Sequence, residues 1–341
     1  MKYISEINTK LKPWEDEELG MTVLDLFAGC GGLSLGFEAL GFKTIGYEMN
    51  EHACATYNKN LNGECYEKFL EVGFEYPEAQ VVIGGPPCQP FSVGGKQKGL
   101  KDSRDGFPVF IDAVKSVKPE FFLFENVKGM LYKNKWYLEQ VIDALEELDY
   151  TVEFRLLNAK HHDVPQNRER IFVVGYKGKF TYPEKSDRLI TVGETLGEMA
   201  KTTPPESKFF TKSMDTYVAK YEKASHCVNP RDLYMDRPAR TLTCRNLAGA
   251  TGDMHRVRLA DGRRRRILHR EAARLQSFPD WFEFMGNDTS RFNQIGNAVP
   301  PMLAYNMAKQ IKKNLTAVDM KRITRRREKQ LEMFKEKTNV S

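Results

Sequence analysis

The 341-residue sequence has no long apolar run and no closely paired cysteines. No segment approaches the roughly 20 apolar residues that span a bilayer, and residues 1–19 lack the apolar core of a signal peptide. We therefore expect a cytoplasmic protein without a membrane partner. The six cysteines form no Cys-x-x-Cys pair and follow no zinc-ligand spacing, so neither a disulfide framework nor a metal site is predicted.

Basic charge is the first positive feature of the chain. The net charge is +6, seven arginines lie within residues 256–270, and residues 321–327 form a second basic run. An isolated basic run is usually a solvated face. Two such runs favour a polyanionic partner whose phosphates are neutralised by arginine and lysine. Charge alone does not separate DNA from RNA.

The order of apolar and amphipathic segments predicts an α/β fold. Strand-like runs alternate with helical patterns up to about residue 175, which indicates a mostly parallel sheet covered on both faces. The predicted strands are 22–27, 43–47, 80–84, 120–125, 151–158 and 170–175, and the helices are 33–40, 51–60, 109–117 and 136–148. Beyond residue 178 the pattern becomes polar and irregular, which predicts a smaller second lobe. Helical periodicity returns at 269–278 and 300–315.

A glycine-rich turn follows the first predicted strand, in Asp25–Gly32. Glycines at a strand-to-helix turn let a ligand approach the backbone, and the helix N-terminus offers free N–H groups. Glu48 ends the second strand about 20 residues later, where a carboxylate suits the hydroxyls of a ribose. These features predict a nucleoside-bearing cofactor. S-adenosylmethionine and a dinucleotide both remain open at this point.

The segment Gly84–Ser92 places Cys88 directly after an apolar strand, on a turn made rigid by prolines. This is the position of a nucleophile, although a structural turn with a buried thiol explains the segment alone equally well. Glu125 ends the next predicted strand in apolar surroundings, which raise a carboxyl pKa and suit a proton donor. Gln166, Arg168 and Arg170 precede the following strand and are expected to reach the same pocket.

Together these segments resemble the cytosine-5 DNA methyltransferase family. Six motifs occur in the family's order between residues 22 and 311: 25–32, 84–92, 125–127, 166–170, 270–279 and 294–301. The resemblance implies a Rossmann-like S-adenosylmethionine-dependent fold with a smaller target-recognition domain. The implied division is an N-terminal extension (1–20), a catalytic domain (21–180), a recognition domain (181–280), a return to the catalytic domain (281–318) and a basic tail (319–341).

The resemblance also implies a mechanism and its residues. Cys88 would attack carbon-6 of a flipped-out cytosine, Glu125 would hold the ring nitrogen, and Arg168 and Arg170 would bind the ring carbonyl or a phosphate. The implied cofactor residues are Phe27, Gly29, Gly31, Glu48, Met49, Glu67, Pro86, Asn297 and Ala298. The implied DNA contacts are Ser92, Lys96, Gln97, Lys98, Arg104, Gln166, Asn229, Arg231, Arg240, Arg245 and Asn246.

Two positions depart from the family's pattern. Glu67 stands where the family usually has an aspartate for the adenine amino group, and Pro108 is expected to interrupt the start of a helix. We expect a monomer that acts on double-stranded DNA, alongside a restriction endonuclease for the same site. The alternatives are a tRNA methyltransferase of the same family, although the triplet Cys-Phe-Thr of that branch is absent, and a non-catalytic homologue.

Overall fold

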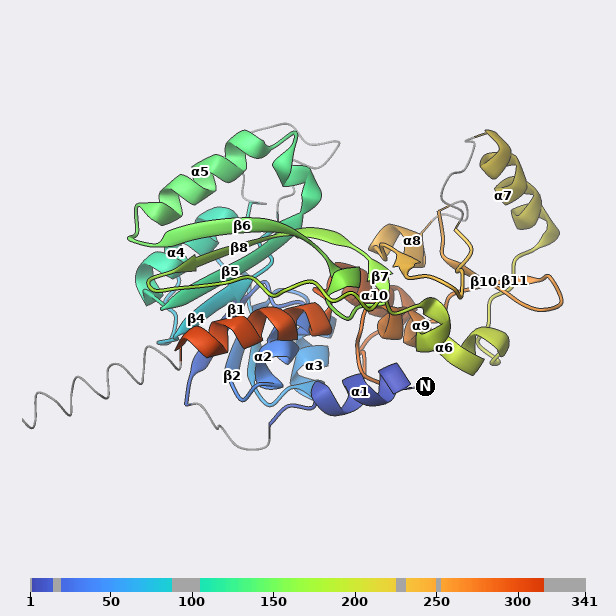
Figure 1. The fold of residues 1–341 in the computed structure, drawn as a ribbon, viewed down its shortest axis with the longest axis horizontal. Coiled ribbons are helices and arrows are strands. Elements are labelled where there is room, and N and C mark those ends of the chain that lie inside the picture. The colour runs from blue at the N-terminus through green and yellow to red at the C-terminus, as the bar shows by residue number, and fades with distance from the viewer. Residues whose placement is uncertain (1, 15–19, 88–104, 225–230, 250–252, 316–341) are drawn as a thin grey trace, which may run out of the picture.

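A computed structural model describes residues 2–14, 20–87, 105–224, 231–249 and 253–315. Its centre is a seven-stranded sheet of order β3-β2-β1-β4-β5-β8-β6 (Figure 1). Five adjacent strands are mutually parallel, namely β3, β2, β1, β4 and β5, while β8 runs antiparallel to both of its neighbours, β5 and β6. The prediction of a mostly parallel sheet is confirmed. The strands are β1 (Thr22–Leu26), β2 (Lys43–Glu48), β3 (Glu64–Glu67), β4 (Val81–Gly84), β5 (Phe121–Val127), β6 (Thr151–Asn158) and β8 (Glu169–Tyr176).

Helices cover both faces of this sheet. Helices α2 (Gly32–Glu38), α3 (Glu51–Asn60) and a helix over 301–315 lie on one face, and α4 (Phe107–Val117) and α5 (Lys135–Glu146) lie on the other (Figure 1). Successive strand residues point to opposite faces. Val23 therefore joins a core on the α2 side, whereas Leu24 joins a separate core on the α4 side.

The predicted N-terminal extension contributes to the larger core. Helix α1 (Lys2–Lys10) buries Tyr3, Ile4 and Ile7 there. The Tyr3 hydroxyl donates to the Asp163 carbonyl oxygen at 2.9 Å, and the indole of Trp281 donates to the Asn8 carbonyl oxygen at 3.0 Å. This helix thereby joins parts of the chain that are far apart in sequence.

Helix α4 begins normally, which corrects the expectation for Pro108. Gly106 is the N-cap, so Pro108 falls within the first helical turn. Backbone N–H groups in the first turn have no partner inside the helix, so a proline there costs no hydrogen bond. The helix runs uninterrupted to Val117.

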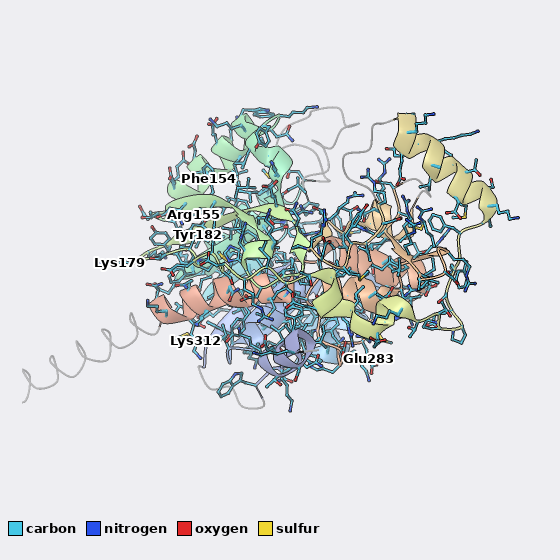
Figure 2. The ribbon with its side chains drawn as sticks, turned by 45° about the vertical axis from the view of Figure 1, so that its right-hand side comes forward. Phe154, Arg155, Lys179, Tyr182, Glu283 and Lys312 are labelled. Carbon is cyan, nitrogen blue, oxygen red and sulfur yellow. The ribbon has the colours of Figure 1, made fainter. Side chains whose placement is uncertain are left out.

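Strand β6 forms one edge of the sheet and is partly covered. Figure 2 shows Phe154 and Arg155 on this strand, with Tyr182 beside them. The Arg155 guanidinium lies 4.8 Å from the centroid of the Tyr182 ring, and the Tyr182 hydroxyl donates to the carbonyl oxygens of Glu153 and Phe172. Charged and covered edges resist pairing with other chains.

The remaining elements lie mainly to one side of the sheet, and α7 stands at their outer end (Figure 1). Two small sheets pair β7 with β9 and β10 with β11. Within the described ranges no helix is long and apolar enough to cross a membrane. The remaining helices and strands are β7 (Gln166–Asn167), α6 (Val192–Leu196), α7 (Lys212–Ala224), β9 (Ala239–Arg240), α8 (Cys244–Ala248), β10 (Arg256–Arg258), β11 (Arg264–Arg266), α9 (His269–Leu275) and α10 (Asp288–Asn297). The 3₁₀ turns are Lys128–Leu131, Ala159–His161 and Gly197–Lys201.

Candidate active site

The turn between β1 and α2 has the backbone that its sequence requires. Gly29 and Gly31 adopt φ values of +55° and +84°, which glycine tolerates without strain, and Phe27 adopts +59°. The Glu48 carboxylate accepts hydrogen bonds from the backbone N–H groups of Gly29 (2.9 Å) and Asn50 (2.8 Å). The end of β2 thereby fixes the turn at the end of β1.

Acidic and aromatic side chains gather at the neighbouring strand ends. Glu67 on β3 is in register with Glu48 on β2, and its side chain is exposed. Tyr47 and Tyr66 stack with their ring centroids 5.6 Å apart, and Met49 is 67% exposed. The structure thus places the two predicted acids of the cofactor site at adjacent strand ends.

The buried carboxyl group of Asp25 connects β1 to helix α2, which follows this turn. Asp25 accepts a 2.6 Å hydrogen bond from Ser34, whose hydroxyl in turn accepts one from Tyr57. Burial is the main cause that raises the pKa of Asp25 to about 7, with a smaller contribution from Glu48. The sequence analysis gave Asp25 no role of its own.

The end of β5 is hydrogen-bonded to the segment that follows β4. The Asn126 side chain donates to the Pro86 carbonyl oxygen at 2.9 Å. The Gly106 N–H donates to the Pro87 carbonyl oxygen at 3.0 Å, and a Cβ at Gly106 would lie 3.0 Å from the Phe27 ring. Pro86 and Pro87 are thereby held between the turn that joins β1 to α2 and the end of β5. Several predicted residues lie outside the described residues: Cys88, Ser92, Lys96, Gln97, Lys98, Arg104 and Asn229.

Glu125 and Arg170 form an ion pair beside this junction. The Nε atom of Arg170 lies 3.0 Å from Oε1 of Glu125, and the two side chains are 13% and 11% exposed. They come from the adjacent antiparallel strands β5 and β8, where Arg170 is in register with Val127. The expected proximity of these two residues is therefore observed.

Arg168 and Gln166 are buried beside the Glu125–Arg170 pair and hydrogen-bond to other segments of the chain. Arg168 is 2% exposed and donates to the carbonyl oxygens of Leu242 (2.8 Å) and Gly296 (3.3 Å). Burial is the main cause that lowers its pKa, to about 9. Gln166 is fully buried, accepts from the Leu242 N–H at 2.9 Å and donates to Gln276. Both side chains therefore join segments that are distant in the sequence.

The last predicted motif, 294–301, packs against the first one, 25–32. A Cβ added to Gly32 would meet the Val299 carbonyl oxygen at 2.5 Å and the Ala298 side chain at 3.3 Å, so helix α2 begins in close contact with this segment. Asn297 is exposed at the end of α10, where its side-chain oxygen accepts from the Cys244 thiol at 2.9 Å. Ala298 therefore lies next to the turn that joins β1 to α2.

Two arginines of the segment 256–270 are enclosed by carboxylates, whereas Arg258 and Arg263 are exposed. Arg256 is fully buried and contacts Glu222 (2.6 Å) and Asp232 (2.5 Å). Arg265 is fully buried against Glu271, which is also fully buried. A guanidinium enclosed by carboxylates is not available to a phosphate.

The other predicted DNA contacts of the second lobe differ in exposure. Asn246 is 3% exposed and forms a capping box with Thr243 at the start of α8. Arg231, Arg240 and Arg245 instead meet at one carboxylate, that of Asp253, which the sequence analysis did not single out. In the described part of the chain, no group of three or more histidine, cysteine, aspartate or glutamate side chains has the arrangement of a metal site.

Comparisons with known proteins show the family to which the chain belongs. The Type II methyltransferase M.AplI of Arthrospira platensis is 55% identical over 320 residues, covering 92% of each chain. M.FnuDI of Fusobacterium nucleatum is 34% identical, covering 87% of this chain and 95% of the relative. The crystal structure of a putative DNA modification methyltransferase from an Escherichia coli prophage shares the fold, with a TM-score of 0.63 at 23% identity over 87% of this chain and 100% of that one. Residues 21–313 match the family described as C-5 cytosine-specific DNA methylase. The chain therefore belongs to this family and is a DNA cytosine-5 methyltransferase.

Proposed function

We propose that the chain methylates carbon-5 of a flipped-out cytosine within one short sequence of double-stranded DNA. The Glu125–Arg170 ion pair carries this proposal, because it sets an oriented carboxylate at the strand ends beside Pro86 and the cofactor turn. The relatives named Type II methyltransferases support a role in protecting DNA from a cognate restriction endonuclease. The enzyme would act as a monomer on the DNA of a bacterial cytoplasm, without direct contact to the endonuclease.

The cofactor turn fits S-adenosylmethionine. A Cβ added to Gly29 would meet no atom within 4 Å, so the turn is open at this glycine, and two carboxylates and aromatic rings lie at the adjacent strand ends. The cofactor supplies an electrophilic methyl group. We assign its binding to Phe27, Gly29, Gly31, Glu48, Met49, Glu67, Pro86, Asn297 and Ala298.

The proposed chemistry begins with Cys88. Its thiolate adds to carbon-6 of the cytosine, and the ring electrons move to carbon-5, which becomes nucleophilic. Glu125 contacts the ring nitrogen and shares a proton there as charge builds, while Arg170 holds Glu125 and faces the ring carbonyl. Carbon-5 would take the methyl group as the bond between that group and the sulfonium sulfur breaks, leaving a neutral thioether, and carbon-5 would then lose its proton to a base. The carbon–sulfur bond breaks and the ring double bond is restored.

The cytosine must leave the helix, because the stacked duplex hides both faces of its ring. Residues around the nucleophile would hold the opened duplex through Ser92, Lys96, Gln97, Lys98 and Arg104. Asn229, Arg231, Arg240 and Arg245 would contact DNA from the second lobe. Arg168 would support the site from within, since its guanidinium bonds to two backbone carbonyls.

A genome-wide measurement tests the proposal. The chain is expressed in bacteria that lack cytosine methylation, and 5-methylcytosine is mapped by sequencing. Cys88→Ser is compared with Cys54→Ser. The Cys54 thiol donates to the Cys65 carbonyl oxygen and accepts from the Asn58 side chain, and a serine hydroxyl can both donate and accept there. We expect one methylated sequence with the wild type and Cys54→Ser, and none with Cys88→Ser. An unmethylated genome with folded wild-type protein would overturn the proposal, and assays on total tRNA would then follow.

A further inference from the structure

A chain of buried hydroxyl groups joins two buried carboxyl groups next to the cofactor turn, between β1 and α2. The contacts run from Asp25 to Ser34 (2.6 Å), from Ser34 to Tyr57 (3.0 Å), from Tyr57 to Thr44 (2.6 Å) and from Thr44 to Glu38 (2.5 Å). Each of these five side chains is at most 2% exposed. Buried polar atoms need hydrogen-bond partners, so the protons along this chain can be counted.

The count indicates that one of the two carboxyl groups holds a proton. Four oxygen–oxygen contacts need four protons, and each of the three hydroxyl groups supplies only one. The shortage lies at Tyr57, whose single proton would have to serve both Ser34 and Thr44. Without a fourth proton, two oxygen lone pairs would face each other inside the protein, which costs as much as a buried hydrogen bond left unmade. A protonated carboxyl group at either end completes the chain.

The fourth proton belongs on Asp25 rather than on Glu38. Burial raises the pKa of both groups, to about 7 for Asp25. Glu38 also accepts from the backbone N–H groups of residues 62 and 63, both at 2.8 Å, and these bonds favour its ionised form. With a proton on Asp25, this residue donates to Ser34 and each hydroxyl donates to the next oxygen toward Glu38. That order is the reverse of the one in which an ionised Asp25 accepts.

The hydrogen-bonded chain is built into the cofactor turn. Asp25 lies on β1 just before the turn. A Cβ at Gly31 would lie 2.8 Å from the Tyr57 ring, so this ring packs directly against the turn. Glu48, which accepts from the Gly29 N–H at 2.9 Å, is close enough for its charge to act on Asp25. A change of charge at the turn therefore acts on Asp25 as well.

Four segments around Asp25 each contribute an acidic group that interacts with it electrostatically. These groups are Glu48 on β2, Cys30 in the turn, Tyr57 on α3 and Cys65 on β3. A neighbouring carboxylate disfavours the ionised form of a carboxyl group, whereas a cation favours it. S-adenosylmethionine carries positive charge on its sulfonium sulfur. Its binding at the turn would therefore favour the loss of the proton from Asp25.

We infer that Asp25 is a proton-holding residue of the cofactor site. In the free protein it is a neutral acid that completes the chain of hydrogen bonds to the ionised Glu38. With S-adenosylmethionine bound, it has lost this proton to the solvent and is a carboxylate that stabilises the positive charge. This inference rests on the proposed function and adds to it a proton that is released when the cofactor binds.

Isothermal titration calorimetry counts the released protons. S-adenosylmethionine is titrated into the full chain in buffers that differ in ionisation enthalpy. The count for Asp25→Asn is subtracted, because an asparagine N–H can complete the same chain without a proton that titrates. We expect a difference of about 0.4–0.5 proton at about pH 7 and almost none at about pH 9, since a nearby cation lowers a carboxyl pKa by about 1–3 from its value of about 7 in Asp25.

Two variants separate the shared proton from the effect of burial alone. Tyr57→Phe keeps the ring but removes the central hydroxyl, and Thr44→Val removes the next one. In either variant the remaining hydroxyl protons serve every remaining contact, so no fourth proton is needed. The pKa of Asp25 should then fall by about 1, and the count at about pH 7 should drop to about 0.1 proton. Tyr150→Phe is the matched control with an unchanged count, because its hydroxyl donates to the Pro119 carbonyl oxygen outside the chain.

Infrared spectra of the cofactor-free protein test the other half of the inference. At about pH 6 the wild type should show the C=O stretching band of a protonated carboxyl group, and Asp25→Asn should lack it. Thermal melting establishes that each variant is folded. If Tyr57→Phe is unfolded, Thr44→Val decides the question.

Three outcomes would overturn the inference. The first is that the wild type lacks the band, and the second is that it releases no more protons than Asp25→Asn. The third is that folded Tyr57→Phe or Thr44→Val releases as many protons as the wild type. All three leave the proposed function intact, because the wild type still binds S-adenosylmethionine. A wild type that does not bind S-adenosylmethionine would instead contradict the proposed function.

Discussion

The buried pair of Arg265 and Glu271 gives a direct test of how the arginine-rich segment is used. Glu271→Gln keeps the size of the side chain but removes its charge. The two contacts of this pair are 2.7 Å and 2.9 Å long, and neither side chain is exposed. In the variant the Arg265 guanidinium would keep the carbonyl oxygens of Met199 and Thr202 as partners, but no anion.

The expected cost follows from the burial and the distance. Two charges about 4 Å apart interact by about 4 kcal/mol at an effective dielectric constant of 20. Removing one partner of a buried ion pair typically costs about 3–5 kcal/mol, because the other charge stays buried. The unfolding entropy of this 341-residue chain is about 0.7 kcal/mol per kelvin, so the midpoint of thermal unfolding should fall by roughly 6 °C.

Urea titration and calorimetry measure this cost. The control is Asp261→Asn, which should leave the midpoint unchanged because Asp261 pairs with Arg263 on the exposed surface. The salt dependence of DNA binding is measured on the same variants. If Arg265 contacted phosphate instead, the loss of the neighbouring anion would tighten DNA binding and steepen its salt dependence. Such a gain, or a stability within about 1 kcal/mol of the wild type, would refute the structural role.

Two further predictions concern the catalytic domain. Because burial raises the pKa of Asp25 to about 7, well above that of the unfolded carboxyl, its contribution to stability is full below about pH 4 and is lost as the pH rises to 7. In urea titrations, the free energy of unfolding of Asp25→Asn minus that of the wild type should therefore rise by about 3 kcal/mol from pH 5 to pH 8. A difference that does not change with pH would contradict this. Arg168→Met should cost about 2–4 kcal/mol in stability, since two buried carbonyls lose their donor. Its kcat at saturating DNA should stay within about tenfold of the wild type, whereas Arg170→Met should lose about 100-fold, and equal losses in kcat would show that Arg168 acts in catalysis.

The order of strands and helices was largely predictable, because apolar runs of strand length alternate with amphipathic segments. Within the seven-stranded sheet the exception is β3, in which only Cys65 is buried. Three exposed residues of four give no apolar signal, and this strand forms through its hydrogen bonds to β2. Pro108 shows the opposite error, since a proline breaks a helix only beyond the first turn.

The candidate site was predictable where adjacent strands bring its residues together. Glu125 and Arg170 are examples, because β5 and β8 are neighbours. Burial of charge was not predictable in the same way. The partners of Arg256 lie 24 and 34 residues away on other elements, and a sequence pattern shows an arginine without showing which carboxylate encloses it. The contacts of Arg168 and Gln166 with Leu242 depend on the same long-range packing.

The two cores that flank the sheet differ in when the ribosome delivers their parts. The core on the α4 side draws its buried residues from Leu24 to Val173, whereas the core on the α2 side needs residues from Tyr3 to Leu315. At about 5–20 residues per second, the second core waits on the order of ten to thirty seconds longer for its last side chains. During that interval the α2 side of the nascent sheet is exposed. Chaperones that bind apolar surface would act on this face. A truncated chain that ends before residue 303 would leave the face permanently exposed.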